Sequence, residues 1–206
     1  MLLQDKHIHH NSNTHASCQG GGVFIDTGPI GLVTLRENLI EHNVAGEDAP
    51  LPSHGYGGGL NLTGDNILLE GNIIRNNMAV GFIWAGNQYW GGFGGAIYIH
   101  DNPTLINNVV AGNTILAPDA THFHAPGIYV NGGSPELIHN TLAGNHGGDG
   151  IGLYAVEDST TRERSQVELF NLSIPLAVTG TLGALRWRST MASALASLAI
   201  STASRA

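Results

Sequence analysis

The stretch LRENLIEHN, residues 35–43, returns three times along the chain with the same spacing of apolar residues and asparagines. The copies are LEGNIIRNN (69–77), LINNVVAGN (105–113) and LIHNTLAGN (137–145), and a degenerate copy, LQDKHIHHN (3–11), opens the chain. From Leu3 to Leu137, the first leucines lie 32, 34, 36 and 32 residues apart. Self-similarity with such a period predicts a repeat architecture.

A second signal is a glycine or Gly-Ala step followed by an apolar-x-apolar triplet. It occurs as GVFI (22–25), GLNL (59–62), GAIYI (95–99), GIYV (127–130) and GIGL (150–153). Alternation with period two over so few residues indicates a strand. Each repeat therefore holds three short strands separated by turns, which predicts one coil of a parallel β-solenoid.

The recurrent asparagines suit such a coil in two ways. Asparagine tolerates left-handed backbone angles at a sharp bend. Coils stacked about 4.8 Å apart also allow equivalent amides to hydrogen-bond as a ladder. The expected ladder residues are Asn38, Asn72, Asn108 and Asn140 in one column and Asn43, Asn77, Asn113 and Asn145 in the other. The alternatives are unrelated Asn-rich turns and a leucine-rich repeat, whose period of about 20–29 residues is shorter.

GGVFI, GGLNL, GGAIYI and PGIYV, joined to the asparagine motifs, resemble right-handed parallel β-helix repeat proteins of the pectin-lyase-like superfamily. The resemblance covers about residues 3–156 and implies an all-β, right-handed parallel β-helix of about five coils. The Gly-preceded strands would form its first sheet, and the Leu and Ile positions its second and third. The superfamily spans polysaccharide lyases, glycoside hydrolases and adhesins, so the resemblance specifies fold better than activity. It implies a secreted or cell-surface protein.

The repeat region is expected to cover residues 1–171 and to continue into further coils of a longer parent chain. Residues 172–206 are rich in Ala, Ser, Thr and Leu and contain no Asp, Glu, Asn or His. We expect this tail to be disordered, irregular or weakly helical, or to cap the solenoid. The charged stretch 157–168 is expected to be a solvated loop.

Composition excludes several classes of protein. The chain has 206 residues, 29 of them glycine and 18 asparagine, and both residues disfavour helix interiors. The net charge of −8 argues against a nucleic-acid partner. No apolar run approaches the roughly 18 residues of a membrane helix. The single cysteine, Cys18, excludes an intrachain disulfide framework.

Two groups of residues are candidates for binding a polysaccharide. Aromatic side chains in long inserts could hold the flat faces of sugars, or could simply cover the flank of the solenoid: Trp84, Tyr89, Trp90 and Phe93. Outward positions of the first sheet form the second group, in which Tyr98 and Tyr129 would contact a glycan or form cross-strand aromatic pairs. The outward columns are Phe24, Asn61, Tyr98 and Tyr129, and then Asp26, Thr63, His100 and Asn131.

Catalysis is the alternative function, as a polysaccharide lyase or glycoside hydrolase using Asp26, Asp65, Asp101 or His100. Glycoside hydrolysis needs two carboxylates roughly 5–9.5 Å apart. The Asn-Thr-Asp, Asp-Asp and Gly-His-Gly motifs of polygalacturonase-like enzymes are absent, and Asp65 and Asp101 equally suit turns. We therefore favour a structural or carbohydrate-binding role without catalysis.

Metal ligation has one weak candidate, His122-x-His124 with Asp119, and His7-x-His9 shows the same spacing. Side chains at i and i+2 of an extended segment share a face. No third histidine follows at a fixed spacing, so exposed polar histidines are the simpler interpretation. No cofactor is expected, although solenoid loops rich in Asp and Asn also suit calcium.

Overall fold

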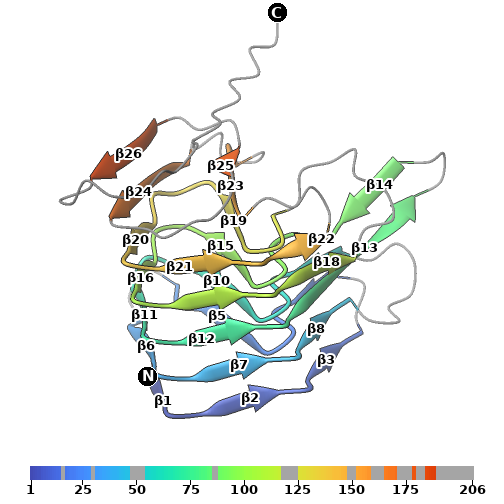
Figure 1. Cartoon of the computed structure of the whole chain (residues 1–206), viewed down its shortest axis with the longest axis horizontal. Coiled ribbons are helices and arrows are strands. Elements are labelled where there is room, and N and C mark those ends of the chain that lie inside the picture. Colours follow the sequence, from blue (N-terminus) through green and yellow to red (C-terminus); the bar gives the residue numbers. More distant parts are fainter. Residues whose placement is uncertain are drawn as a thin grey trace, which may run out of the picture.

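The computed structural model describes residues 1–14, 17–28, 31–46, 54–84, 88–116, 125–147, 152–158, 165–170, 178–179 and 184–188. Strands of successive repeats lie on top of one another, in parallel and in register, with the N-terminus at one end of the stack (Figure 1). The described residues contain strands and turns and no α-helix. The chain is thus an all-β parallel solenoid, as its sequence predicts.

The second sheet shows the predicted register directly. Leu3 pairs with Leu35, Leu35 with Leu69, and the same column continues through Leu105, Leu137 and Leu169. Its seven strands, in spatial order, are β1 (Leu2–Gln4), β6 (Val33–Arg36), β11 (Ile67–Glu70), β16 (Thr104–Ile106), β20 (Glu136–Ile138), β24 (Gln166–Phe170) and β26 (Ala184–Arg188).

The first and third sheets also contain the segments that the motifs predict. The first sheet consists of β5 (Val23–Asp26), β10 (Leu60–Thr63), β15 (Ile97–His100), β19 (Ile128–Asn131), β23 (Leu153–Val156) and β25 (Val178–Thr179). The third consists of β2 (His7–His9), β7 (Leu39–Glu41), β12 (Ile73–Arg75), β17 (Val109–Ala111) and β21 (Thr141–Ala143). Three strands of this third sheet have a neighbour on both sides, so about three turns are fully enclosed where the sequence suggested about five.

A fourth sheet was not predicted. The inserts after the second asparagine begin with strands of their own, followed by further short strands on the same side of the solenoid. They are β3 (Ser12–Asn13), β8 (Val44–Ala45), β13 (Met78–Trp84), β18 (Thr114–Leu116) and β22 (His146–Gly147), with β4 (Ser17–Gln19), β9 (His54–Tyr56) and β14 (Gln88–Gly91) beside them. Most of these strands have only two to four residues, which is too short for alternation to reveal them.

The asparagine ladder is confirmed. Asn38, Asn72 and Asn108 each donate Nδ2 to the next ladder Oδ1 at 2.9 Å, ending on Asn140. The second column does the same from Asn43 through Asn77 and Asn113 to Asn145, at 2.9–3.0 Å. Each of these amides also donates to a backbone carbonyl of the preceding coil, as Asn72 does to Leu35 at 2.9 Å. The ladder therefore satisfies polar groups that the coils bury.

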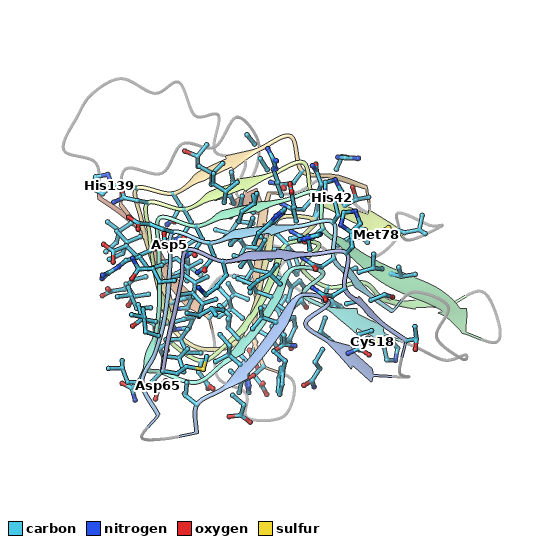
Figure 2. All side chains as sticks on the ribbon, turned by 90° about the horizontal axis from the view of Figure 1, so that it is seen from below. Asp5, Cys18, His42, Asp65, Met78 and His139 are labelled. Atoms are coloured by element: carbon cyan, nitrogen blue, oxygen red, sulfur yellow. The ribbon has the colours of Figure 1, made fainter. Side chains whose placement is uncertain are left out.

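The predicted left-handed backbone at the ladder residues themselves is wrong. Among the described residues, positive φ angles of 53–66° occur at the residue before each ladder position instead. These residues are Asp5, Glu37, Gly71, Asn107 and His139 at one corner, and His10, His42, Asn76, Gly112 and Gly144 at the next. The bend thus precedes the asparagine, whose amide is turned to the neighbouring coils. Figure 2, along the stack, marks these corners with Asp5, His139 and His42.

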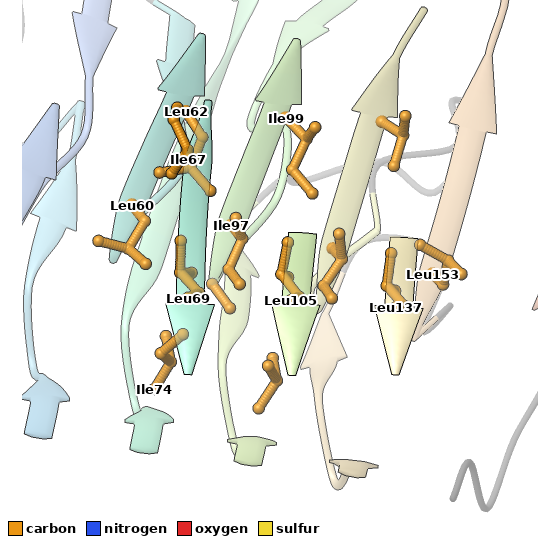
Figure 3. Packing of buried hydrophobic residues seen from close by; sticks show 14 of the residues in the cluster. Leu60, Leu62, Ile67, Leu69, Ile74, Ile97, Ile99, Leu105, Leu137 and Leu153 are labelled. Atoms are coloured by element: carbon orange, nitrogen blue, oxygen red, sulfur yellow. The ribbon is translucent and has the colours of Figure 1, made fainter. Parts of the chain in front are cut away.

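The core is a narrow column of aliphatic side chains between the first three sheets (Figure 3). Leu60, Leu62, Ile97 and Ile99 from the first sheet face the leucine column of the second, and all are fully buried. Burial of each such side chain contributes about 1.5–3 kcal/mol. Cys18 in β4 is buried with Ala45 in β8, in a small separate cluster.

Beyond residue 171 the described residues lie in β25 and β26, which pair with β23 and β24. The rest of the tail lies outside the described residues, so the expectation of a disordered, weakly helical or capping tail stays a prediction there.

Candidate functional site

Five aromatic rings pack in two interlocking columns on the outside of the first sheet, and we call them the aromatic cluster: Tyr56, Phe93, Tyr98, Tyr129 and Tyr154. Tyr98 stacks on Tyr129 with centroids 5.7 Å apart and an interplanar angle of 7°, and Tyr129 lies 5.5 Å from Tyr154. In the second column Tyr56 stacks on Phe93 at 5.3 Å. Edge-to-face contacts of 5.1 Å (Tyr56 to Tyr98) and 5.0 Å (Phe93 to Tyr129) join the columns. The expected cross-strand aromatic pairs are therefore present.

Glycine turns bring the second column against the first. Tyr56 is followed by Gly57 (φ 69°), and Phe93 by Gly94 (φ 66°). These turns fold the chain back immediately before β10 and β15, so that each ring meets an outward residue of the next coil. The local sequence aromatic-Gly-Gly thus positions each ring of the second column.

Beside the aromatic cluster runs a row of polar side chains, the polar column, made of Asp26, Thr63, His100 and Asn131. Thr63 pairs with Asp26 on one side and with His100 on the other. Asn131 follows Val130, whose partner is Ile99, so it continues the same row. Asp26 is exposed and the other three are half-buried. One polar group is therefore presented on each of four successive coils.

A buried carboxylate lies behind the upper end of the polar column. Asp158 Oδ2 accepts hydrogen bonds from His100 Nε2 at 3.0 Å and Asn131 Nδ2 at 3.3 Å, and its side chain is 6% exposed. Burial raises the pKa of the Tyr98 hydroxyl, and nearby Tyr56 and Asp158 raise it further, whereas a side-chain hydrogen bond with Asn131 partly offsets this. Tyr98 therefore remains a neutral hydroxyl throughout the physiological range.

The sequence model of the right-handed β-helix region matches residues 2–168. The chain belongs to the right-handed β-helix family. No curated protein and no solved structure matches it significantly. The match includes every strand from β1 to β23, and it confirms the resemblance drawn from the repeats.

The insert aromatics of this β-helix lie in a hairpin. β13 and β14 pair antiparallel, with Trp84 opposite Gln88, Ile83 opposite Tyr89, and Phe82 opposite Trp90. The side chains of Trp84, Tyr89 and Trp90 lie outside the described part of the structure, so their predicted role in binding stays a prediction. Phe93, by contrast, lies in the aromatic cluster together with Tyr98 and Tyr129.

Of the three candidate catalytic aspartates, Asp65 and Asp101 occupy turns, whereas Asp26 is the last residue of β5. Asp26 Oδ1 accepts a hydrogen bond from the Gly28 amide at 3.0 Å, and Asp65 Oδ1 accepts one from Asn102 at 2.5 Å. Asp101 has a φ of 82° in the turn after β15. Figure 2 marks Asp65 at the corner that follows the first sheet. The turn roles considered for Asp65 and Asp101 are thus observed.

The sequence did not predict that Asp158 contacts the polar column or that Tyr154 belongs to the aromatic cluster. Asp158 belongs to the charged stretch expected to be solvated, yet the residue as a whole is only 4% exposed. It lies 58 residues along the chain from its partner His100. Tyr154 occupies the middle of the strand after Gly152, so the alternation that places Tyr98 and Tyr129 outward could have found it.

The candidate metal ligands Asp119, His122 and His124 lie outside the described residues, so that prediction is untested. In the part of the chain that the structure describes, no three or more His, Cys, Asp and Glu side chains are grouped to hold a metal ion. The rings of His7 and His9 do lie together, with centroids 4.1 Å apart. The described residues also include no helix able to span a membrane.

A cluster of charged side chains lies on the third sheet, whereas the aromatic cluster lies on the first. Glu41 accepts hydrogen bonds from Arg75 Nε at 2.7 Å and His7 Nε2 at 2.8 Å. The Arg75 hydrogen bond is the main cause that lowers the pKa of Glu41 below its ordinary value of 4.5, burial opposes it, and His7 adds to the lowering. The cluster links three coils through one carboxylate.

Because the folded-state pKa of Glu41 is lowered, its ionised form stabilises the fold fully above about pH 4.5, and this contribution is lost as pH falls through the lower folded-state value. We expect Glu41→Gln to make the melting temperature less dependent on pH in that acid window. Thermal unfolding between about pH 3 and 6 tests this. Glu70→Gln, which removes the partner of Arg36 from an exposed pair, is the control and should change the slope less. Equal slopes for wild type and Glu41→Gln would contradict the assignment.

Proposed function

We propose that this β-helix binds an extended glycan along the outward face of its first sheet. The observation that carries the proposal is the polar column running in register beside the aromatic cluster over successive coils. Coils rise by about 4.8 Å, which is close to the length of one sugar unit, so each coil could meet one residue of a linear polymer. Such a role places the protein outside the cell or on its surface, where extended polysaccharides occur, and it requires no cofactor.

The face suits hydroxyl-rich ligands. Thr63, His100 and Asn131 provide a hydroxyl, an imidazole and an amide, each able to hydrogen-bond a sugar hydroxyl. Tyr98 and Tyr129 stack on each other, so a sugar would meet the edges of these rings rather than open ring faces. Phe24 at the lower end is 49% exposed and offers an open apolar surface.

Charge favours a neutral glycan over a polyuronate. Asp26 is exposed beside the polar column and Asp158 lies behind it, and both carboxylates repel an anionic polymer. No lysine or arginine belongs to the polar column. The net charge of −8 acts in the same direction.

The test is isothermal titration of the full chain with soluble β-glucan, xylan and galactomannan, and with polygalacturonate as the anionic comparison. We expect a neutral polymer to bind, and His100→Ala and Asn131→Ala each to weaken binding about tenfold, the worth of one good hydrogen bond. Ile73→Ala, on the exposed side of the third sheet, should leave binding unchanged. Unchanged affinity in both polar variants would contradict the proposal, as would a wild-type chain that binds none of these polymers.

A second candidate is a polysaccharide lyase or glycoside hydrolase, favoured by the contact between His100 and Asp158. A buried carboxylate that accepts from Nε2–H leaves Nδ1 as the basic nitrogen and orients the ring for proton transfer. Catalysis would release new reducing ends or unsaturated uronate, measured by reducing-sugar assay and ultraviolet absorbance. Products that disappear in both His100→Ala and Asp101→Ala would favour this enzyme, and glycan retention without products would favour binding alone.

A further inference from the structure

We infer that Asn61 determines specificity on the glycan-binding face, by accepting a hydrogen bond from one sugar hydroxyl. The inference rests on the proposed function and assigns a chemical role to one side chain of the same face. It is carried by a buried amide oxygen for which the described part of the chain provides no hydrogen-bond partner.

Asn61 lies at the middle of β10 and points away from the core. Its strand neighbours Leu60 and Leu62 are fully buried on the inner side. Across the sheet it pairs with Phe24 on one side and Tyr98 on the other. Asn61 thus interrupts an otherwise aromatic column that runs on to Tyr129.

The amide is nevertheless buried. Asn61 is 2% exposed, and within the described residues its Oδ1 atom has no hydrogen-bond partner. An unpaired buried acceptor costs about 1–3 kcal/mol. The ladder asparagines show the contrast, since the Oδ1 of Asn72 accepts from both the backbone and the side chain of Asn38.

The side chains beside Asn61 on the N-terminal side of β10 are exposed. Gln19 pairs with Tyr56, and Tyr56 with Phe93, in the segment that precedes the first sheet. Tyr56 precedes β10 and packs against Tyr98, the outward residue of the strand in the next coil. Gln19 is the equivalent of Tyr56 one coil earlier, and Asn61 is the equivalent of Tyr98, so the same arrangement puts Gln19 next to Asn61. Gln19 and Phe24 are both exposed. In this proposal a sugar hydroxyl reaches Asn61 Oδ1 when these two exposed side chains change rotamer, a motion that takes only picoseconds to nanoseconds.

A sugar hydroxyl supplies the missing donor. The interaction satisfies the buried oxygen only when a donor is present, so an analogue that lacks this hydroxyl leaves it unpaired again. Sites built in this way discriminate strongly against ligands without the donor. An aromatic side chain at position 61 would continue the column without burying an unpaired oxygen. A residue kept at such a position although it lowers the stability of the fold is the pattern expected of a functional residue.

The experiment compares wild type with Asn61→Leu, a side chain of similar size without polar atoms. Titration with cellohexaose, xylohexaose and mannohexaose measures binding, and thermal unfolding measures stability. We expect Asn61→Leu to bind about tenfold more weakly than wild type while its melting temperature rises by about 2–4 °C. Thr34→Leu, at an outward position of the second sheet, is the matched control and should change neither by as much.

Three other outcomes overturn the inference. If Asn61→Leu is more stable and binds the oligosaccharides as wild type does, the amide holds a buried water only. If Asn61→Leu is less stable than wild type, the amide is a satisfied structural group. If wild type binds none of the three hexasaccharides, the proposed function fails first, before any variant is compared.

Discussion

Replacing Asn77 with alanine is expected to lower the free energy of unfolding by about 3–5 kcal/mol. The Asn77 amide donates to the Ile40 carbonyl at 2.9 Å and to Asn113 Oδ1 at 3.0 Å. Its oxygen accepts from the backbone amide and the side chain of Asn43, at 3.1 and 2.9 Å. Alanine would leave several of these buried groups without partners, and each costs about 1–3 kcal/mol. The loss is a large part of the stability of an ordinary domain.

Chemical unfolding followed by far-ultraviolet circular dichroism measures this effect. Asn11→Ala is the matched control, because Asn11 stands at the exposed end of the same ladder. Its side chain makes one ladder hydrogen bond, from Nδ2 to Asn43 at 2.8 Å. We expect this variant to lose less than about 1 kcal/mol. Equal losses at Asn11 and Asn77 would mean that the ladder is not what stabilises the inner coils.

Gly57→Ala is expected to destabilise the chain by more than about 3 kcal/mol, or to prevent folding altogether. Gly57 has a φ of 69°, and a Cβ atom there would lie 1.8 Å from the Leu60 carbonyl oxygen. A left-handed alanine alone costs about 1–2 kcal/mol. The clash adds to this, because the carbonyl belongs to the backbone of Leu60, the first residue of β10, and cannot move without disturbing that strand.

The matched control is Gly144→Ala. Gly144 has a φ of 60°, but a Cβ atom there meets nothing within 4 Å. This variant should therefore lose only the conformational cost of about 1–2 kcal/mol. Soluble yield and urea midpoints of the two variants provide the comparison, and near-ultraviolet circular dichroism of the tyrosines reports on the aromatic cluster. A Gly57→Ala protein as stable as Gly144→Ala would show that the turn relaxes easily.

The repeat register could be read from the sequence because each signal is local to one coil. Spacings of 32–36 residues between leucines correctly predicted which leucines pair, and the recurring asparagines correctly predicted the ladder. Alternation within the Gly-preceded strands placed Asn61, Tyr98 and Tyr129 on the outward face. Period-two alternation suffices here because one side of each strand must enter a dry core.

The tertiary structure alone decided which inserts and distant segments meet. The fourth sheet arises from strands of two to seven residues that have no periodic pattern. The contacts of Tyr56 with Tyr98 and of His100 with Asp158 join residues in different coils. Such contacts depend on how loops fold back between coils, which side-chain alternation does not encode. In the same way, only the packing around β10 shows that Asn61, outward by its position in the strand, is buried, with an oxygen that no described residue pairs.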